Sequence, residues 1–302
     1  MEKIPYYSLN NYLKEHFGCK VLKLSLDAGC TCPNRDGTLG TRGCIFCSEG
    51  GSGDFAADRS LPIREQIKVA KELQRGKNPK NAGVKYIAYF QAYTNTYGEL
   101  CKLKEKYMEA IDDPDVVCLS IATRPDCLEN DKLQLLEELN KIKPVWVELG
   151  LQTIHPRSIE YIRRGYDNLT YDDAVRKLTD MGIEVITHVI LGLPGETKED
   201  MLETVEYVAH SGSKGIKLQL LHVLKNTDLC VDYKKGLFET LSLDEYVDIV
   251  CEAVKLLPKD MVVHRITGDG DKKILVAPMW SADKKRVLNT FAQRLEPVGK
   301  NW

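Results

Sequence analysis

The sequence has little net charge and no long apolar run. Its 302 residues include 42 basic and 44 acidic side chains, so the formal net charge is −2. Such a balance gives no global attraction to nucleic acid, and a polyanionic partner must meet a local basic patch. No apolar stretch reaches the length of a membrane span, and the opening MEKIPYYSLNNYLKEHFG has no apolar segment after its charges. We therefore expect a soluble, cytoplasmic protein without membrane contacts.

Cysteine is modest in number, with ten residues in the chain. That density, without a secretory signal, argues against a disulfide framework. Three of the ten, Cys32, Cys44 and Cys47, nevertheless lie in one run, CPNRDGTLGTRGCIFC, just after a predicted first strand. Three thiolates from one loop hold three irons of a 4Fe-4S cluster and leave the fourth iron open to a small molecule. The loop therefore predicts a reactive metal site.

A structural zinc ion is the main alternative for this loop. Zinc needs a fourth ligand to close its tetrahedron, and the candidates are Cys30, His155 and His188. Only one residue separates Cys30 from Cys32, a spacing that fits poorly into one tetrahedral shell. We therefore favour the cluster, and a non-catalytic, zinc-stabilised binding module remains as the alternative. Most of the other cysteines are expected to be inert core residues.

Short runs rich in Val, Ile and Leu alternate with amphipathic stretches along the chain. This order is typical of parallel strands joined by helical crossovers. Six such runs begin at Val21, Lys85, Val116, Val145, Glu184 and Gly215. Six βα units fall short of the eight that close a full barrel. We therefore predict an α/β fold, a partial (β/α)6 TIM-like barrel with a C-terminal extension.

The predicted boundaries divide the chain into an N-terminal arm (1–18), a partial barrel (19–256) and an extension packed on the barrel (257–302). Two capping boxes, Thr170–Asp173 and Ser242–Glu245, are expected to begin helices. In barrels of this kind, the chemistry collects at the carboxyl ends of the strands. The cysteine loop follows the first strand, and FQAYTNT, ATRPD, GLQT, GLPGE and HVLKNT follow the others. The active site is therefore predicted at that rim.

Several segments, taken together and in order, carry a resemblance to a known family. They are TCPNRDGT with GCIFC, YFQAYTNTY, TRPDC, VWVELGLQT, IRRGY, HVILGLPGE, LHVLKNT, RITGDG and AP-x-W. The chain resembles the radical SAM enzymes, more narrowly the YhcC/YtqA-type family and more distantly the radical SAM domain of the elongator catalytic subunit. The resemblance implies a 4Fe-4S cluster on Cys32, Cys44 and Cys47, S-adenosylmethionine as cofactor, and an electron donor such as flavodoxin or ferredoxin.

The resemblance also implies cofactor contacts at the rim. Phe46 is expected beside the adenine, with plain loop packing as the alternative, and the backbone at Gln91 is expected to receive the methionine amino group. Gln152 matches a polar contact to the cofactor. Arg164 matches an arginine that pairs with the cofactor carboxylate, which suits a planar bidentate donor.

Two further contacts come from the fifth strand and the turn after it. His188 matches a residue that contacts the ribose, although a lone histidine in ITHVILG otherwise reads as a satisfied core residue. Gly192 and Gly195, in GLPGE, are expected to let the backbone approach the adenine, because glycine lacks a Cβ. An ordinary strand-to-helix turn is the alternative for this pair.

The substrate implied by the resemblance is the wobble uridine of a tRNA, with carboxymethylaminomethyl-uridine trimmed to aminomethyl-uridine ahead of a separate methyltransferase. Candidate substrate residues are Arg124, Lys217, His222, Lys225 and Arg265. Four basic residues of the last segment are candidates for a patch that contacts phosphates: Lys284, Lys285, Arg286 and Arg294. Three aromatic residues are candidates for base stacking: Trp280, Tyr93 and Tyr97. The same machinery acting on a small metabolite or a tetrapyrrole is the alternative within enzymes.

Overall fold

The computed structural model describes residues 6–51, 53, 56–77, 83–268, 270 and 272–295. The first five residues of the predicted arm and the last seven of the predicted extension therefore lie outside the described residues. Asp269, in RITGDG, lies outside them as well, and so does Asp271, which follows that segment.

Within the described residues, seven parallel strands form one sheet in the order β1-β2-β3-β4-β5-β6-β8. They are β1 (Val21–Leu26), β2 (Lys85–Phe90), β3 (Val116–Thr123), β4 (Val145–Gln152), β5 (Glu184–Leu191), β6 (Gly215–Leu220) and β8 (Val262–Arg265). The partial barrel is confirmed, and the first six strands are those predicted from the sequence. The seventh, β8, lies in the segment predicted as an extension and extends the sheet beyond β6.

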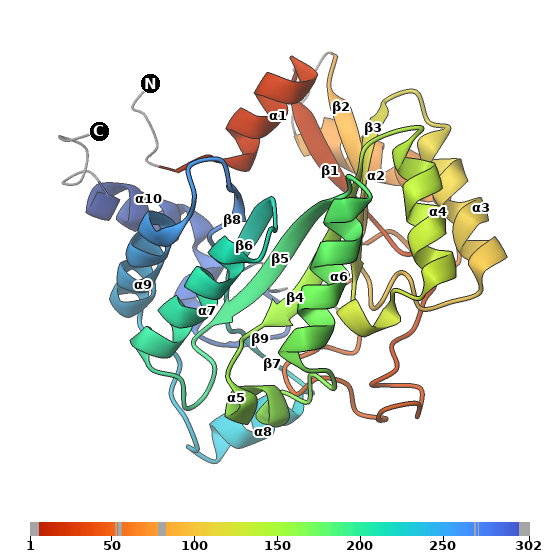
Figure 1. The fold of residues 1–302 in the computed structure, drawn as a ribbon. Coiled ribbons are helices and arrows are strands. Elements are labelled where there is room, and N and C mark those ends of the chain that lie inside the picture. Colours follow the sequence, from red (N-terminus) through yellow and green to blue (C-terminus); the bar gives the residue numbers. More distant parts are fainter. Residues whose placement is uncertain are drawn as a thin grey trace.

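Helices cover the outer face of the sheet, and smaller elements lie at its ends (Figure 1). No helix among the described residues is long and apolar enough to cross a membrane. The helices are α1 (Leu9–Phe17), α2 (Ile63–Lys77), α3 (Leu100–Ile111), α4 (Asn130–Asn140), α5 (Pro156–Tyr161), α6 (Asn168–Asp180), α7 (Lys198–His210), α8 (Asp228–Lys234), α9 (Leu243–Leu256) and α10 (Lys284–Leu295), with 3-10 turns η1 (Pro125–Cys127) and η2 (Met279–Ala282). Near α8, β7 (Val223–Leu224) pairs antiparallel with β9 (Leu275–Ala277).

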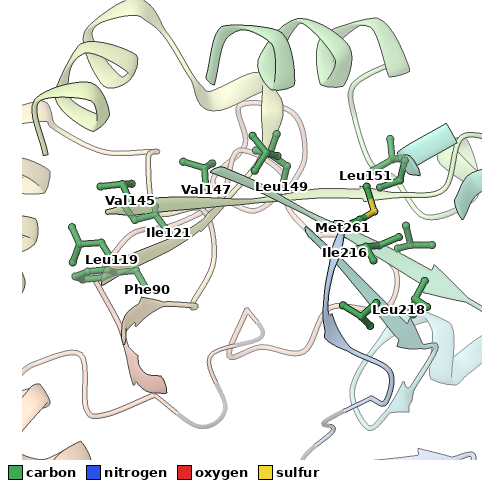
Figure 2. Close-up of a cluster of buried hydrophobic side chains, with 14 of the residues drawn as sticks. Phe90, Leu119, Ile121, Val145, Val147, Leu149, Leu151, Ile216, Leu218 and Met261 are labelled. Carbon is green, nitrogen blue, oxygen red and sulfur yellow. The ribbon is translucent and has the colours of Figure 1, made fainter. Parts of the chain in front are cut away.

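Alternate residues of each strand face the helices and the barrel interior. On β4, Val145, Val147, Leu149 and Leu151 join the large core cluster under the helices (Figure 2). Because side chains alternate along a strand, the residues between them, including Glu148, face the interior. The sheet therefore has an apolar outer face, and its inner face can carry polar groups.

Helix α1 closes the barrel interior at the amino ends of the strands. Tyr12 and Leu13 of α1 form a buried cluster with Trp146, Ile186 and Val262 from three strands. The backbone N–H of Val263 donates to the carbonyl of Tyr7 at 2.8 Å, which ties the segment before α1 to β8. This apolar cluster forms the floor of the interior.

One of the two predicted capping boxes is present. Ser242 and Glu245 cap α9 reciprocally, as predicted. The box predicted at Thr170–Asp173 is wrong, because α6 already begins at Asn168 and is capped by the carboxylate of Asp167, which accepts from the Thr170 N–H at 2.8 Å.

Candidate active site

A cavity of about 250 Å³ lies at the carboxyl ends of the strands, and it brings together most of the predicted site residues. The cysteine loop forms part of its wall, and residues of β2 to β6 and β8, with the loops that follow them, form the rest. Predicted residues among the lining are Cys32, Cys44, Cys47, Phe46, Gln91, Gln152, Arg164, His188, Arg124, Lys217, His222 and Arg265.

The cysteine loop is held by its own backbone and by one asparagine. The N–H of Cys47 donates to the carbonyl of Cys44 at 3.0 Å, and the N–H of Gly43 donates to the carbonyl of Asn34 at 2.7 Å. Gly43 has a φ of +73°, which side chains with a Cβ rarely adopt. The Asn34 amide donates to the carbonyl of Arg163 at 2.7 Å and lies 3.4 Å from the Cys44 sulfur. These bonds fix the shape of the loop.

The three thiols are close enough to influence one another. Burial, and to a smaller extent negative charge on Cys47 and Cys32, raises the pKa of Cys44 to about 12 against Arg124 and Asn34, which lower it. Burial thus favours the neutral thiol of Cys44. A cationic cluster would stabilise the thiolates, because only the thiolate is a metal ligand.

The spacing of the sulfur atoms favours a cluster over a single ion. Among the described residues, the one group of three potential ligands whose donor atoms all lie within 4.8 Å of one another is His155, Asp200 and Glu203. At least one pair of the three cysteine sulfurs is therefore more than 4.8 Å apart, which exceeds the roughly 3.8 Å that separates two thiolates on a tetrahedral zinc ion. A multi-iron cluster carries its thiolates on different irons, and so the donor set fits it.

The three candidates for a fourth zinc ligand either lie outside the cavity lining or contact other groups. The buried Cys30 is absent from the cavity lining. His155 Nε2 contacts the carbonyl of Asp200 at 2.8 Å, and both ring nitrogens of His188 have partners within the barrel. This arrangement does not support the alternative of a closed zinc site.

The backbone and side chain of Gln152 indicate that a ligand binds in this cavity. Its φ is +69°, at a register shift between β4 and β5, and a non-glycine residue in this region is strained. Its side-chain oxygen is buried and has no hydrogen-bond partner among the described residues. Such an atom is expected to gain a partner when a ligand binds. Because Gln152 lines the same cavity as the thiols, the residues fit a bound cofactor here.

Arg164 is occupied by the protein itself. It is 1% exposed, and its guanidinium donates to the carbonyls of Leu151 (2.9 Å), Thr153 (2.7 Å) and Tyr166 (3.0 Å) and to the side-chain oxygen of Asn168 (2.9 Å). These bonds use four of its five N–H groups. The geometry is that of a residue that ties the loop after β4 to the loop before α6. Pairing of Arg164 with a cofactor carboxylate stays a prediction, and one N–H of the guanidinium is left to donate to that carboxylate.

Several other predicted residues also have structural partners. Gly192 and Gly195 are absent from the cavity lining and adopt φ values of +91° and +86°, as a strand-to-helix turn requires. Arg124 forms a bidentate pair with Asp126, at 2.9 and 2.7 Å. Lys225 is absent from the lining and donates to the carbonyl of Lys273 at 2.9 Å.

The predicted RNA contacts receive mixed support. Tyr93 lines the cavity, whereas Tyr97 does not. The indole N–H of Trp280 donates to the carbonyl of Leu241 at 3.0 Å, and its ring packs near Tyr246, so this tryptophan closes the core. In the predicted patch of α10, Arg294 pairs with two acidic residues of α9, Asp244 and Asp248.

A layer of buried polar side chains inside the barrel was largely missed by sequence reasoning. Its centre is Glu148 on β4, 1% exposed, whose carboxylate contacts Lys23 (2.9 Å), Ser120 (2.7 Å), His188 (2.7 Å) and Lys217. Burial acts to raise the pKa of Glu148, but Lys217, Lys23 and His188 outweigh it and hold the pKa well below 4.5. The only available signal was a charged residue inside the apolar run VWVELGLQ.

His188 belongs to this layer and is neutral there. Burial and the nearby Lys217 lower its pKa to about 4, against the opposing effect of Glu148. Its Nδ1 lies 3.1 Å from the side-chain amide of Gln219, and its Nε2 lies 2.7 Å from the Glu148 carboxylate. The proton therefore sits on Nε2, where it is donated to the carboxylate.

Comparison with known proteins places the chain in a family. Residues 37–208 match the Radical SAM superfamily, and residues 213–297 match the Radical_SAM C-terminal domain. YtqA of Bacillus subtilis is 47% identical over 97% of this chain and 90% of its own length. A tRNA uridine(34) acetyltransferase of Methanocaldococcus jannaschii is 29% identical over 53% of this chain and 30% of its own length.

Among solved structures, an archaeal Elp3 from Methanocaldococcus infernus shares the fold. The TM-score is 0.68 at 18% sequence identity, over 91% of this chain and 63% of that one. The family implies a 4Fe-4S cluster and S-adenosylmethionine, which agrees with the donor set of the cavity. On these grounds the chain belongs to the radical SAM superfamily.

Proposed function

We propose that this radical SAM enzyme trims the wobble uridine of tRNA, converting carboxymethylaminomethyl-uridine to aminomethyl-uridine. The observation that carries the proposal is that one cavity is lined by three cysteines outside any disulfide and by the basic side chains Lys217 and Arg265. The uridine base is suggested by the partial similarity to a tRNA uridine(34) acetyltransferase. That match covers 30% of the relative, so the tRNA uridine is carried over and the acetyl transfer is not.

Within this proposal, Cys32, Cys44 and Cys47 would hold the cluster, and the unpartnered oxygen of Gln152 would accept a hydrogen bond from S-adenosylmethionine. When bound, the cofactors supply a 5′-deoxyadenosyl radical that removes a hydrogen atom from the substrate. The apolar face of Phe46 and the buried walls of the cavity shield the reacting carbon from water during hydrogen abstraction, and water adds only after that carbon has been oxidised.

The net reaction balances without a further oxidant. The N–CH₂ carbon of the carboxymethyl arm is oxidised by two electrons, and S-adenosylmethionine is reduced by two electrons to methionine and 5′-deoxyadenosine. Water supplies the oxygen as the C–N bond breaks, and the products are the aminomethyl group and glyoxylate. An external donor is then needed to reduce the cluster before turnover, and a separate methyltransferase can act on the amine.

The direct test uses the anaerobically reconstituted protein and tRNA that carries carboxymethylaminomethyl-uridine. We expect aminomethyl-uridine, 5′-deoxyadenosine and glyoxylate in equal amounts, measured by mass spectrometry of digested nucleosides and by trapping of the aldehyde. Cys44→Ala should abolish all three products and the cluster absorbance. Cys101→Ala is the matched control, because that cysteine is exposed and lies on α3.

Two outcomes would contradict the proposal. Abundant 5′-deoxyadenosine with unchanged tRNA would point to a small-molecule substrate. A colourless protein that holds zinc and makes no 5′-deoxyadenosine would point to a binding module. Binding of tRNA should also weaken steeply as salt rises, because phosphate contacts release counterions.

A further inference from the structure

The strands β5, β6 and β8 place three nitrogen-bearing side chains in one row. His188 pairs in register with Lys217, and Lys217 pairs in register with Arg265. Register partners in a parallel sheet point to the same face, so these three side chains share the barrel interior. All three also line the cavity that contains the cysteine loop. The row is therefore part of the active-site wall.

Lys217 is the most buried member of the row, at 2% exposure. Its ammonium contacts the Glu148 carboxylate and the Tyr89 hydroxyl, the latter at 3.1 Å. An ammonium group has three N–H donors, so these two contacts leave one N–H for a ligand. Since Lys217 lines the cavity, a ligand there can accept it.

The charges around Lys217 do not balance. Its pKa is lowered well below 10.5, first by burial and then by the cations Lys23 and Arg265, while Glu148 acts in the opposite direction. The Glu148 carboxylate is also shared with Lys23 and His188. One carboxylate thus faces two lysine side chains, Lys217 and Lys23, and the neutral imidazole of His188 in a buried layer. Buried charges are stable when they are paired, so this layer favours an added anion.

The depth of the row limits which anion can reach it. Lys217 and His188 lie in the middle of their strands, above the apolar floor that includes Trp146 and Ile186. A phosphate of a polynucleotide is flanked by two sugars and stays at the rim. A carboxylate at the end of a slender arm can pass down to mid-strand.

From this geometry we infer that Lys217, held by Glu148 and Tyr89, binds a carboxylate of the substrate at mid-strand depth in the barrel. The inference deepens the proposed function and rests on it only for the identity of the molecule that bears the carboxylate. Glu148 is a positioning residue, because it touches Lys217 and His188. The arm of carboxymethylaminomethyl-uridine, whose carboxylate lies next to the carbon to be oxidised, is the expected ligand.

The test measures carboxylate preference with small probes, so that it does not depend on tRNA. Binding of N-benzylglycine and of its uncharged amide is measured by calorimetry on reconstituted protein saturated with S-adenosylmethionine, which occupies the cofactor's own carboxylate site. Wild type should bind the carboxylate roughly tenfold or more tightly than the amide, as a hydrogen bond to a charged group implies. Lys217→Met should lose this preference. Lys214→Met, on the exposed lysine that pairs with Asp260, is the matched control and should keep it.

A second variant covers the case in which Lys217→Met does not fold. Lys217→Met combined with Glu148→Gln removes both members of the buried pair, and it should show the same loss of preference. The inference is overturned if wild type binds both probes equally, if either variant keeps the preference, or if inorganic phosphate competes as well as N-benzylglycine does.

A second experiment distinguishes failure of this inference from failure of the proposed function. It uses an anticodon stem-loop RNA that carries carboxymethylaminomethyl-uridine or aminomethyl-uridine. If the RNA is neither bound nor converted while the probe preference still depends on Lys217, the tRNA proposal fails and the carboxylate site stands. If the RNA is converted equally well by Lys217→Met, the site is wrong and the tRNA proposal stands.

Discussion

Replacing Glu148 by Gln should destabilise the protein more than any surface charge change. The amide keeps the shape of the side chain and can still accept from Ser120, but it leaves Lys217 and Lys23 without their carboxylate. Removing one partner of a buried ion pair costs about 3–5 kcal/mol. With an unfolding entropy of roughly 2.1 cal/mol/K per residue, about 0.6 kcal/mol/K for 302 residues, the expected fall in Tm is about 5–8 °C.

The assay is thermal and urea unfolding of anaerobically purified protein, followed by circular dichroism. Glu138→Gln is the matched control, because Glu138 and its partner Lys104 are both more than half exposed and such pairs contribute about 0.2–1 kcal/mol. The double variant with Lys217→Met should lose less than the sum of the two single changes, since it removes both charges together. A loss below about 1 kcal/mol for Glu148→Gln would refute the description of a buried ion network.

The effect should also depend on pH, with a sign set by the lowered pKa of Glu148. A carboxylate with a lower pKa in the folded state stabilises the protein above its unfolded pKa and loses that contribution as the pH falls. The stability difference between wild type and Glu148→Gln should therefore be full at neutral pH and shrink below pH 4.5. A difference that grows in acid would contradict the assignment.

Three further predictions follow from single contacts. Arg164→Lys should lower the free energy of unfolding by roughly 1–3 kcal/mol, because lysine cannot serve the four acceptors of the guanidinium; an unchanged urea midpoint would show that these bonds are dispensable. Gly268→Ala should lower product formation with the cluster absorbance intact, since a Cβ there would overlap the His222 ring in the cavity wall; full activity would mean that the ring moves freely. Thr197→Ala should cost about 1 kcal/mol by removing a capping box, whereas Thr170→Ala should cost less, because Thr170 caps no helix; equal losses would refute this reading of the helix starts.

The strand order and the cysteine loop could be predicted because both depend on local patterns. Six of the seven strands of the sheet are runs rich in Val, Ile and Leu, and the cysteines are close in sequence. The strand β8 could not be recognised in the same way, because its four residues, Val262–Arg265, are half apolar and half polar. Its place beside β6 is decided by pairing with a strand more than forty residues away in sequence.

The roles of individual polar residues were predicted less well. The cofactor role expected of Arg164 stays a prediction, and what the sequence did not show is that its guanidinium bonds to Leu151, at the end of β4, and to Thr153, just after it. Glu148 was overlooked, because one charged residue in an apolar strand shows neither its direction nor its partners. Lys23, His188 and Lys217 lie 125, 40 and 69 residues away from it in sequence.

The sequence by itself determined the fold class, the family and the candidate metal ligands, since periodic burial and short-range cysteine spacing are properties of neighbouring residues. Tertiary structure alone decided which polar groups meet inside the barrel. Strand register sets those meetings, and a shift of one residue would turn Glu148 or Lys217 toward the apolar helices. Because charges removed from water must find their partners within the protein, the register also decides which buried charged groups stabilise one another.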